Sequence, residues 1–217
     1  LETLPQYSDI FPKDCLAVLL IEQVGDCPED VSRKIEKCTS DAGSLSCGSG
    51  VFLGEDEQLR IWKSRKDAVP LLSREKGDSR PIAFIEDVSV ENVLLARYLN
   101  GMEQIGEKYG IPMAFFGHAG DGELHIRPYL DLAEETGIEK MKNIADEVFE
   151  LAWSLGGTIS GEHADGLVRA AYIRKQYGDE YYELRKSIKK TFDPACILNP
   201  DKILSDDPDV MVKNLRA

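Results

Sequence analysis

Residues 116–125 read Phe-Gly-His-Ala-Gly-Asp-Gly-Glu-Leu-His, and this stretch decides how we interpret the chain. It holds two of the three histidines, one on either side of a turn rich in glycine. The third, His163, follows Glu162 in a similar run, Ser-Gly-Glu-His-Ala-Asp-Gly, over 160–166. Because every histidine lies near glycines and a carboxylate, we interpret the rest of the chain as the scaffold that brings these segments together.

The segments that flank the turn predict a β-hairpin. Residues 112–117 and 124–130 have the composition of strands, and the Ala-Gly-Asp-Gly run between them is typical of a tight turn. Apolar runs at 15–24 and 81–88 predict two further strands, the first of them buried.

Five stretches have the apolar spacing of amphipathic helices: 29–38, 55–72, 90–109, 138–155 and 177–192. Strands therefore alternate with helices, but no phosphate-binding glycine signature follows a strand. Together with the hairpin, this favours an α+β fold over a doubly wound one. We expect an antiparallel β-sheet with helices packed mainly on one face and with ferredoxin-like elements.

Composition limits the class of partner. The 217 residues are 42% hydrophobic, which is enough for a full core in one large domain or two small ones. With 39 acidic against 26 basic residues, the net charge of −13 argues against nucleic acid as a partner.

Cysteine usage and hydropathy indicate the compartment. Five cysteines without C-x-x-C spacing predict reduced, partly buried thiols of a cytoplasmic protein, with no disulfide framework and no iron–sulfur ligand set. The longest apolar run, around 17–21, is too short for a transmembrane segment. The chain begins with Leu1 and not with methionine, so we expect it to be a piece of a longer polypeptide.

The histidine segments are candidates for metal chemistry. In a hairpin, His118 and His125 can point into one space and bind a divalent ion such as zinc or manganese, with Glu162 as a third ligand. His163 directly follows Glu162, so we expect one of the two to ligate and the other to transfer protons. The spacing alone also permits structural histidines beside an ordinary Asp-Gly turn.

Three motifs together resemble a known family. They are Gly-His-Ala-Gly-Asp-Gly-Glu-Leu-His at 117–125, Ser-Gly-Glu-His-Ala-Asp-Gly-Leu-Val-Arg at 160–169 and Asp-Pro-Ala-Cys-Ile-Leu-Asn-Pro-Asp-Lys-Ile at 193–203. In this order they resemble the C-terminal domain of FAD-linked oxidases of the vanillyl-alcohol-oxidase-like family. The relevant branch includes glycolate oxidase, D-lactate dehydrogenase and D-2-hydroxyglutarate dehydrogenase.

The resemblance implies a domain organisation. Residues 1–217 would be a single substrate domain, preceded by an FAD-binding domain that this sequence does not contain. The second motif is most similar to long family members that carry a downstream iron–sulfur module, so such a module or another electron carrier is an expected partner. The tail, 193–217, would return toward the flavin.

The resemblance also implies roles for residues. His118, His125 and Glu162 match the metal ligands, and His163 matches the base that takes the proton of the substrate hydroxyl. Arg65 matches the arginine that clamps the substrate carboxylate. Asn199 and Lys202 match the tail that returns to the flavin edge.

Three positions depart from the family pattern. Glu123 stands where asparagine is common, Arg127 stands where some members have a substrate-contacting asparagine, and Arg80 is near a position that is lysine in some members. We include both arginines among the candidate substrate-binding residues.

The resemblance implies oxidation of a 2-hydroxy acid, of the D-lactate, glycolate or 2-hydroxyglutarate type, by metal-assisted proton abstraction and hydride transfer to FAD. We expect the isolated domain to be inactive. Two alternatives stay open at this point: a free-standing metal-dependent hydrolase, and a non-enzymatic ferredoxin-like ligand-binding module.

Overall fold

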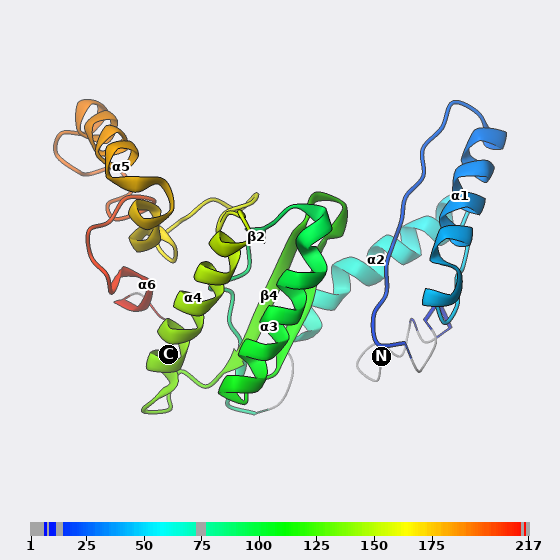
Figure 1. The fold of residues 1–217 in the computed structure, drawn as a ribbon, viewed down its shortest axis with the longest axis horizontal. Helices are drawn as coiled ribbons and strands as arrows, with labels where there is room; N and C mark the ends of the chain where they lie inside the picture. The colour runs from blue at the N-terminus through cyan, green and yellow to red at the C-terminus, as the bar shows by residue number, and fades with distance from the viewer. Residues whose placement is uncertain (1–6, 8, 12–14, 73–76, 214, 216–217) are drawn as a thin grey trace. The chain divides into compact units, whose positions relative to one another are not determined.

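The computed structural model describes residues 7, 9–11, 15–72, 77–213 and 215. The chain divides into two compact units, Leu1–Glu75 and Lys76–Ala217. The placement of the two units relative to one another is not determined (Figure 1).

The regular secondary structure of the described part of the N-terminal unit is helical. It contains α1 (Pro28–Ala42), the 3-10 helix η2 (Gly43–Leu45) and α2 (Glu55–Leu72). Proline opens α1 and acidic residues occupy the first turn of both long helices, where the helix dipole favours negative charge. Both helices confirm the sequence-based prediction.

The predicted buried strand at 15–24 is wrong. This segment forms no strand, and its apolar side chains are exposed, with Leu19 at 71% and Val24 at 75%. A strand needs a neighbouring strand to complete its backbone hydrogen bonds, and the described part of the N-terminal unit contains none. The apolar composition of this segment therefore predicted both the strand and its burial wrongly, because composition says nothing about a pairing partner.

The C-terminal unit contains an antiparallel sheet of four strands: β1 (Arg80–Pro81), β2 (Val88–Ser89), β3 (Met113–His118) and β4 (Glu123–Leu130). β4 is central. It pairs with β3 along one edge, and with β1 and β2 at opposite ends of the other edge. The predicted hairpin and the predicted α+β class with an antiparallel sheet are therefore confirmed.

The predicted strand at 81–88 is only partly correct. Its two ends pair with β4 as β1 and β2, while the residues between them leave the ladder. The bowed segment buries Phe84 and Ile85 in the core. Glu86 and Asp87 follow them, directly before β2. Such an interruption re-aims side chains, as bulges beside functional sites do.

Two helices cover one face of the sheet (Figure 1). They are α3 (Leu95–Tyr109), which follows the 3-10 helix η3 (Asn92–Leu94), and α4 (Gly137–Ser154). The predicted helix at 90–109 therefore begins five residues later than expected, and it ends as predicted at Gly110 in the left-handed conformation. The helix predicted at 138–155 matches α4.

The remaining elements follow the second histidine segment. They are the 3-10 helix η5 (Ala170–Tyr172), α5 (Ile173–Phe192) and α6 (Val210–Lys213). α5 contains the helix predicted at 177–192 and is interrupted at Gly178, whose φ of 83° is not helical.

Alternation along β4 positions the functional side chains. Leu124 and Ile126 face the core between the sheet and its helices. Because side chains alternate along a strand, Glu123, His125 and Arg127 face the other way. On this second face, His125 contacts Glu86 of the bow and Glu162 of the second histidine segment.

All five cysteines are free, and Cys27, Cys47 and Cys196 are exposed and not partly buried as predicted. None of the described helices is both long enough and apolar enough to cross a membrane.

Candidate functional site

The hairpin sets the first two histidines on one face. Phe116 pairs with His125 across the strands and His118 pairs with Glu123, so all four side chains share the face away from the helices. The turn between the strands contains the 3-10 helix η4 (Ala119–Asp121) and then Gly122 in the left-handed conformation, at φ 68°.

Glu162 brings the three histidines together. Its Oε1 lies 3.5 Å from His118 Nε2, 3.4 Å from His125 Nε2 and 3.3 Å from His163 Nε2. The rings of His125 and His163 are stacked, with centroids 5.0 Å apart. The two segments that the sequence singled out therefore form one cluster.

The hydrogen bonding of His125 determines which nitrogen is free. Its Nδ1 lies 2.6 Å from the backbone oxygen of Glu86, and a carbonyl can only accept. Nδ1 therefore carries the proton, and Nε2 presents its lone pair toward Glu162. A histidine that donates one N–H to a carbonyl and offers the other nitrogen is the usual arrangement of a metal ligand.

The distances fit a divalent ion. Ligand atoms of His118, His125 and Glu162 all lie within 4.8 Å of one another. Four ligands placed tetrahedrally at about 2.1 Å from zinc are about 3.4 Å apart, which agrees with the 3.4 and 3.5 Å separations from Glu162. Two imidazoles and one carboxylate form a catalytic type of donor set, which leaves a position for substrate.

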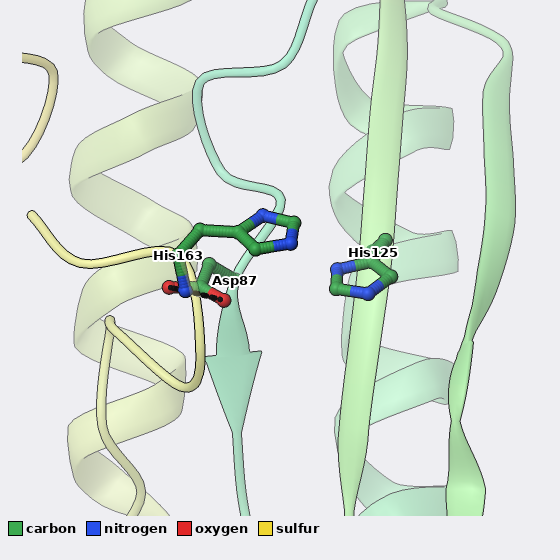
Figure 2. A group of neighbouring side chains, drawn as sticks. All are labelled: Asp87, His125 and His163. Carbon is green, nitrogen blue, oxygen red and sulfur yellow. Dashed lines mark hydrogen bonds between the residues drawn. The ribbon is translucent and has the colours of Figure 1, made fainter. Parts of the chain in front are cut away.

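A second group, Asp87 with His125 and His163, also has ligand atoms close enough together to hold a metal, and Figure 2 shows it. Asp87 is 0% exposed, and its carboxylate accepts hydrogen bonds from the backbone N–H groups of Gly161, Glu162 and His163 at 3.0 to 3.2 Å. The guanidinium of Arg169 adds a contact at 3.1 Å. These donors occupy the carboxylate, so Asp87 anchors the backbone of the second histidine segment, 160–166.

The electrostatics agree with this role. Burial acts to raise the pKa of Asp87, but hydrogen bonds from the Glu162 backbone and from Glu123, with the Arg169 charge, hold that pKa below its usual value. Asp87 therefore stays ionised.

Glu123 behaves in the opposite way. Burial, the hydrogen bond to Asp87 and the nearby Glu162 charge raise the pKa of Glu123 to about 7. Its Oε1 is buried and has no hydrogen-bond partner. We interpret it as a protonated carboxyl that donates to Asp87 under mildly acidic conditions.

Sequence reasoning missed Glu86 and Asp87 as site residues. The side chain of Glu86 contacts both His163 and Arg127. The available signal was the pair of acids that closes the apolar run at 81–88. Without the bow in the backbone, strand alternation would have sent these two side chains to opposite faces.

The structure places the predicted arginines differently. Arg127 is on the histidine face, with its guanidinium 5.5 Å from the centre of the Phe116 ring. Arg80 pairs with Leu130 and hydrogen-bonds to backbone carbonyls of Gly77 and Ser79. The five residues from His125 to Leu130 span roughly 17 Å, so the structure does not bring Arg80 to the histidines.

Arg65 lies on α2 in the N-terminal unit, so its role stays a prediction. The Lys202 ammonium donates to the Asn199 side chain at 3.2 Å. Nearby, the Ile203 N–H donates to the Gly166 carbonyl at 2.7 Å, which ties this tail to the end of the second histidine segment. The flavin contacts expected of Asn199 and Lys202 also stay predictions.

Comparison with known proteins agrees with the family resemblance of the three sequence motifs. The family described as FAD linked oxidases, C-terminal domain, matches residues 2–203. Glycolate oxidase subunit GlcD of Bacillus subtilis is 35% identical over 201 residues, which cover 90% of this chain and 41% of that protein. D-2-hydroxyglutarate dehydrogenase of Pseudomonas putida is 34% identical over 204 residues, covering 90% of the chain and 20% of that protein.

A shorter match includes D-lactate dehydrogenase of Archaeoglobus fulgidus, which is 35% identical over 129 residues, covering 59% of the chain and 28% of that protein. The chain thus spans less than half the length of each of these relatives.

Proposed function

Because the chain belongs to the family of FAD-linked oxidases, of which it matches the C-terminal domain, we propose that it is the substrate-side part of a flavin-dependent enzyme that oxidises a 2-hydroxy acid. The observation that carries the proposal is the convergence of three imidazoles on Glu162 Oε1 at 3.3 to 3.5 Å. The names of the relatives suggest substrates of the glycolate, D-lactate or D-2-hydroxyglutarate type.

The proposal includes partners. An FAD-binding domain would hold most of the flavin, with Asn199 and Lys202 at the flavin edge. An electron carrier, in the long family members an iron–sulfur module, would receive the electrons. The family match supports this proposal over a free-standing hydrolase or a non-enzymatic ligand-binding module.

In this mechanism His118, His125 and Glu162 hold a divalent ion, zinc or manganese. When bound, the ion supplies Lewis acidity toward the substrate hydroxyl, and the flavin supplies a two-electron acceptor. The protein supplies orientation and proton transfer. Arg127 is on the same face as the ligands, and its guanidinium can pair with a substrate carboxylate, with Arg65 as the second candidate clamp.

His163 is the proposed base. Its Nε2 lies 3.3 Å from Glu162 Oε1, so a hydroxyl held at the ligand cluster would be within reach of it. Imidazole also titrates in the range that proton transfer near neutral pH requires. The backbone hydrogen bonds to Asp87 hold both residues in place.

The experiment uses the complete flavoenzyme, expressed with its FAD-binding domain. We expect His163→Ala to lower kcat for the 2-hydroxy acid by about 100-fold or more while the metal content stays unchanged. We expect His118→Ala to lose the metal and the activity together. Full turnover in His163→Ala, or a full metal content in His118→Ala, would contradict the assignment.

A further inference from the structure

Glu86 contacts three site residues through three different atoms. Its backbone oxygen accepts from His125 Nδ1 at 2.6 Å. Its Oε2 accepts from the Arg127 guanidinium at 2.8 Å, and its Oε1 lies 3.4 Å from His163 Nδ1. The side chain belongs to the bow between β1 and β2 and is only 17% exposed.

We propose that Glu86 is the positioning residue for His163. Its carboxylate accepts a hydrogen bond from the Nδ1–H of His163. This leaves Nε2 as the nitrogen that takes the proton of the substrate hydroxyl. The role of His163 as base rests on the proposed function, whereas the tautomer of His163 does not.

A neutral imidazole carries one proton, on either Nδ1 or Nε2. Each ring nitrogen of His163 lies near a carboxylate, Nδ1 at 3.4 Å from Glu86 Oε1 and Nε2 at 3.3 Å from Glu162 Oε1, but only the contact with Glu86 has hydrogen-bond geometry. Because a carboxylate only accepts, Glu86 stabilises the tautomer with the proton on Nδ1. Nε2 of His163 then presents a lone pair at the place where Nε2 of His118 and His125 also converge. The orienting carboxylate of the Ser-His-Asp triad acts by the same logic.

Arg127 fixes the orientation of the carboxylate. Because its guanidinium can only donate, it engages Oε2 and leaves Oε1 for His163. The 3.4 Å separation is long for a hydrogen bond, and bonds of this kind tighten when substrate is bound.

The proton transfer balances on these atoms. The substrate O–H bond breaks, and an N–H bond forms at His163 Nε2. The resulting imidazolium keeps its Nδ1–H directed toward the Glu86 carboxylate, whose charge stabilises it. No other group has to change its protonation state in this step.

The sharpest test is Glu86→Gln, which changes one atom and nearly conserves the shape. Arg127 requires an acceptor, so it would take the amide oxygen and turn the NH₂ group toward His163 Nδ1. Nδ1 would then have to accept, and His163 would move to the Nε2–H tautomer. A residue that only supported the fold would not invert a tautomer.

The measurement is a long-range ¹H–¹⁵N correlation spectrum of the histidine rings, recorded on this chain without metal at about pH 8.5, above the usual imidazole range. We expect Nδ1–H at His163 in the wild type and Nε2–H in Glu86→Gln. His125 should stay Nδ1–H in both, because its partner is a backbone oxygen, and it therefore reports on the fold. Glu103→Gln, at an exposed position on α3, is the matched control.

Nε2–H at His163 in the wild type would overturn the proposal, and so would an unchanged His163 in Glu86→Gln. If the variant loses the His125 pattern, its fold has changed, and the wild-type spectrum alone then decides the proposal.

A second readout is the kinetics of the complete flavoenzyme. We expect Glu86→Gln to lower kcat by about 100-fold or more, mainly without a change in KM, and Glu103→Gln to change neither. If the wild-type flavoenzyme turned over no 2-hydroxy acid, the proposed function would fail while the tautomer result still decided the role of Glu86.

Discussion

The carboxylate of Asp87 accepts a hydrogen bond from the backbone N–H of Glu162 at 3.0 Å, across 75 residues of sequence. The same carboxylate accepts from the backbone of His163 at 3.2 Å. One buried acid on the bow therefore fixes both the third proposed metal ligand and the proposed base. The stability and the geometry of the site depend on it together.

We first predict that Asp87→Ala destabilises the protein severely. The substitution leaves the buried Arg169 without its counter-ion and several backbone N–H groups without an acceptor. Removing one partner of a buried ion pair costs about 3–5 kcal/mol. The free energy of unfolding in urea measures this loss. Asp121→Ala, at an exposed position in the hairpin turn, should change it by less than about 0.5 kcal/mol, and equal losses in the two variants would refute the anchoring role.

The second prediction concerns pH. Since the folded-state pKa of Glu123 is raised to about 7 from its ordinary value of 4.5, the folded state holds this proton more tightly than the unfolded state. Its stabilising contribution is complete below about pH 4.5 and is lost as the pH rises through about 7. Without metal, we expect Glu123→Gln to lose less stability than the wild type between pH 5 and about 8, by about 1–3 kcal/mol. Parallel stability curves would contradict the assignment.

A third prediction tests the turn. A Cβ on Gly122 would lie 1.9 Å from the Val90 carbonyl oxygen, and the φ of this residue is 68°. We therefore expect Gly122→Ala to cost at least about 1–3 kcal/mol. Gly120 in the same turn has open space around it, so Gly120→Ala should be nearly neutral. Thermal unfolding of the two variants gives the comparison, and similar melting temperatures would show that the turn relaxes.

The fourth prediction is stabilisation by metal. A ligand that binds only the folded state adds about 2.7 kcal/mol when its concentration is 100 times Kd. We expect zinc to raise the melting temperature of the wild type and a chelator to reverse the rise. His118→Ala should remove the effect, while His163→Ala should retain most of it. A shift of the same size in His118→Ala would place the ion elsewhere.

The sequence predicted the local features of the fold well. The hairpin, α2 and α4 follow from hydrophobic period and from glycine positions, because these signals lie within each segment. The strand expected at 15–24 failed because strands depend on a partner from elsewhere in the chain. The prediction of a continuous strand at 81–88 was only partly correct for a related reason. No local signal distinguishes a continuous strand from one whose middle, here 82–87, leaves the ladder.

The site was predictable in part. His118, His125, Glu162 and His163 were all identified, and the structure brings the four together. Glu86 and its contacts were not predicted, because they depend on the bow. The functional meaning of the segments came from the family motifs and not from spacing, which left a structural role open.

The most direct test of the central claim is a crystal structure of the zinc-loaded chain with anomalous scattering measured at the zinc edge. We expect one ion within about 2.0–2.2 Å of His118 Nε2, His125 Nε2 and a Glu162 carboxylate oxygen, with His163 outside the ligand set. An ion bound by His163 and Asp87, or no ordered ion at these residues, would contradict it.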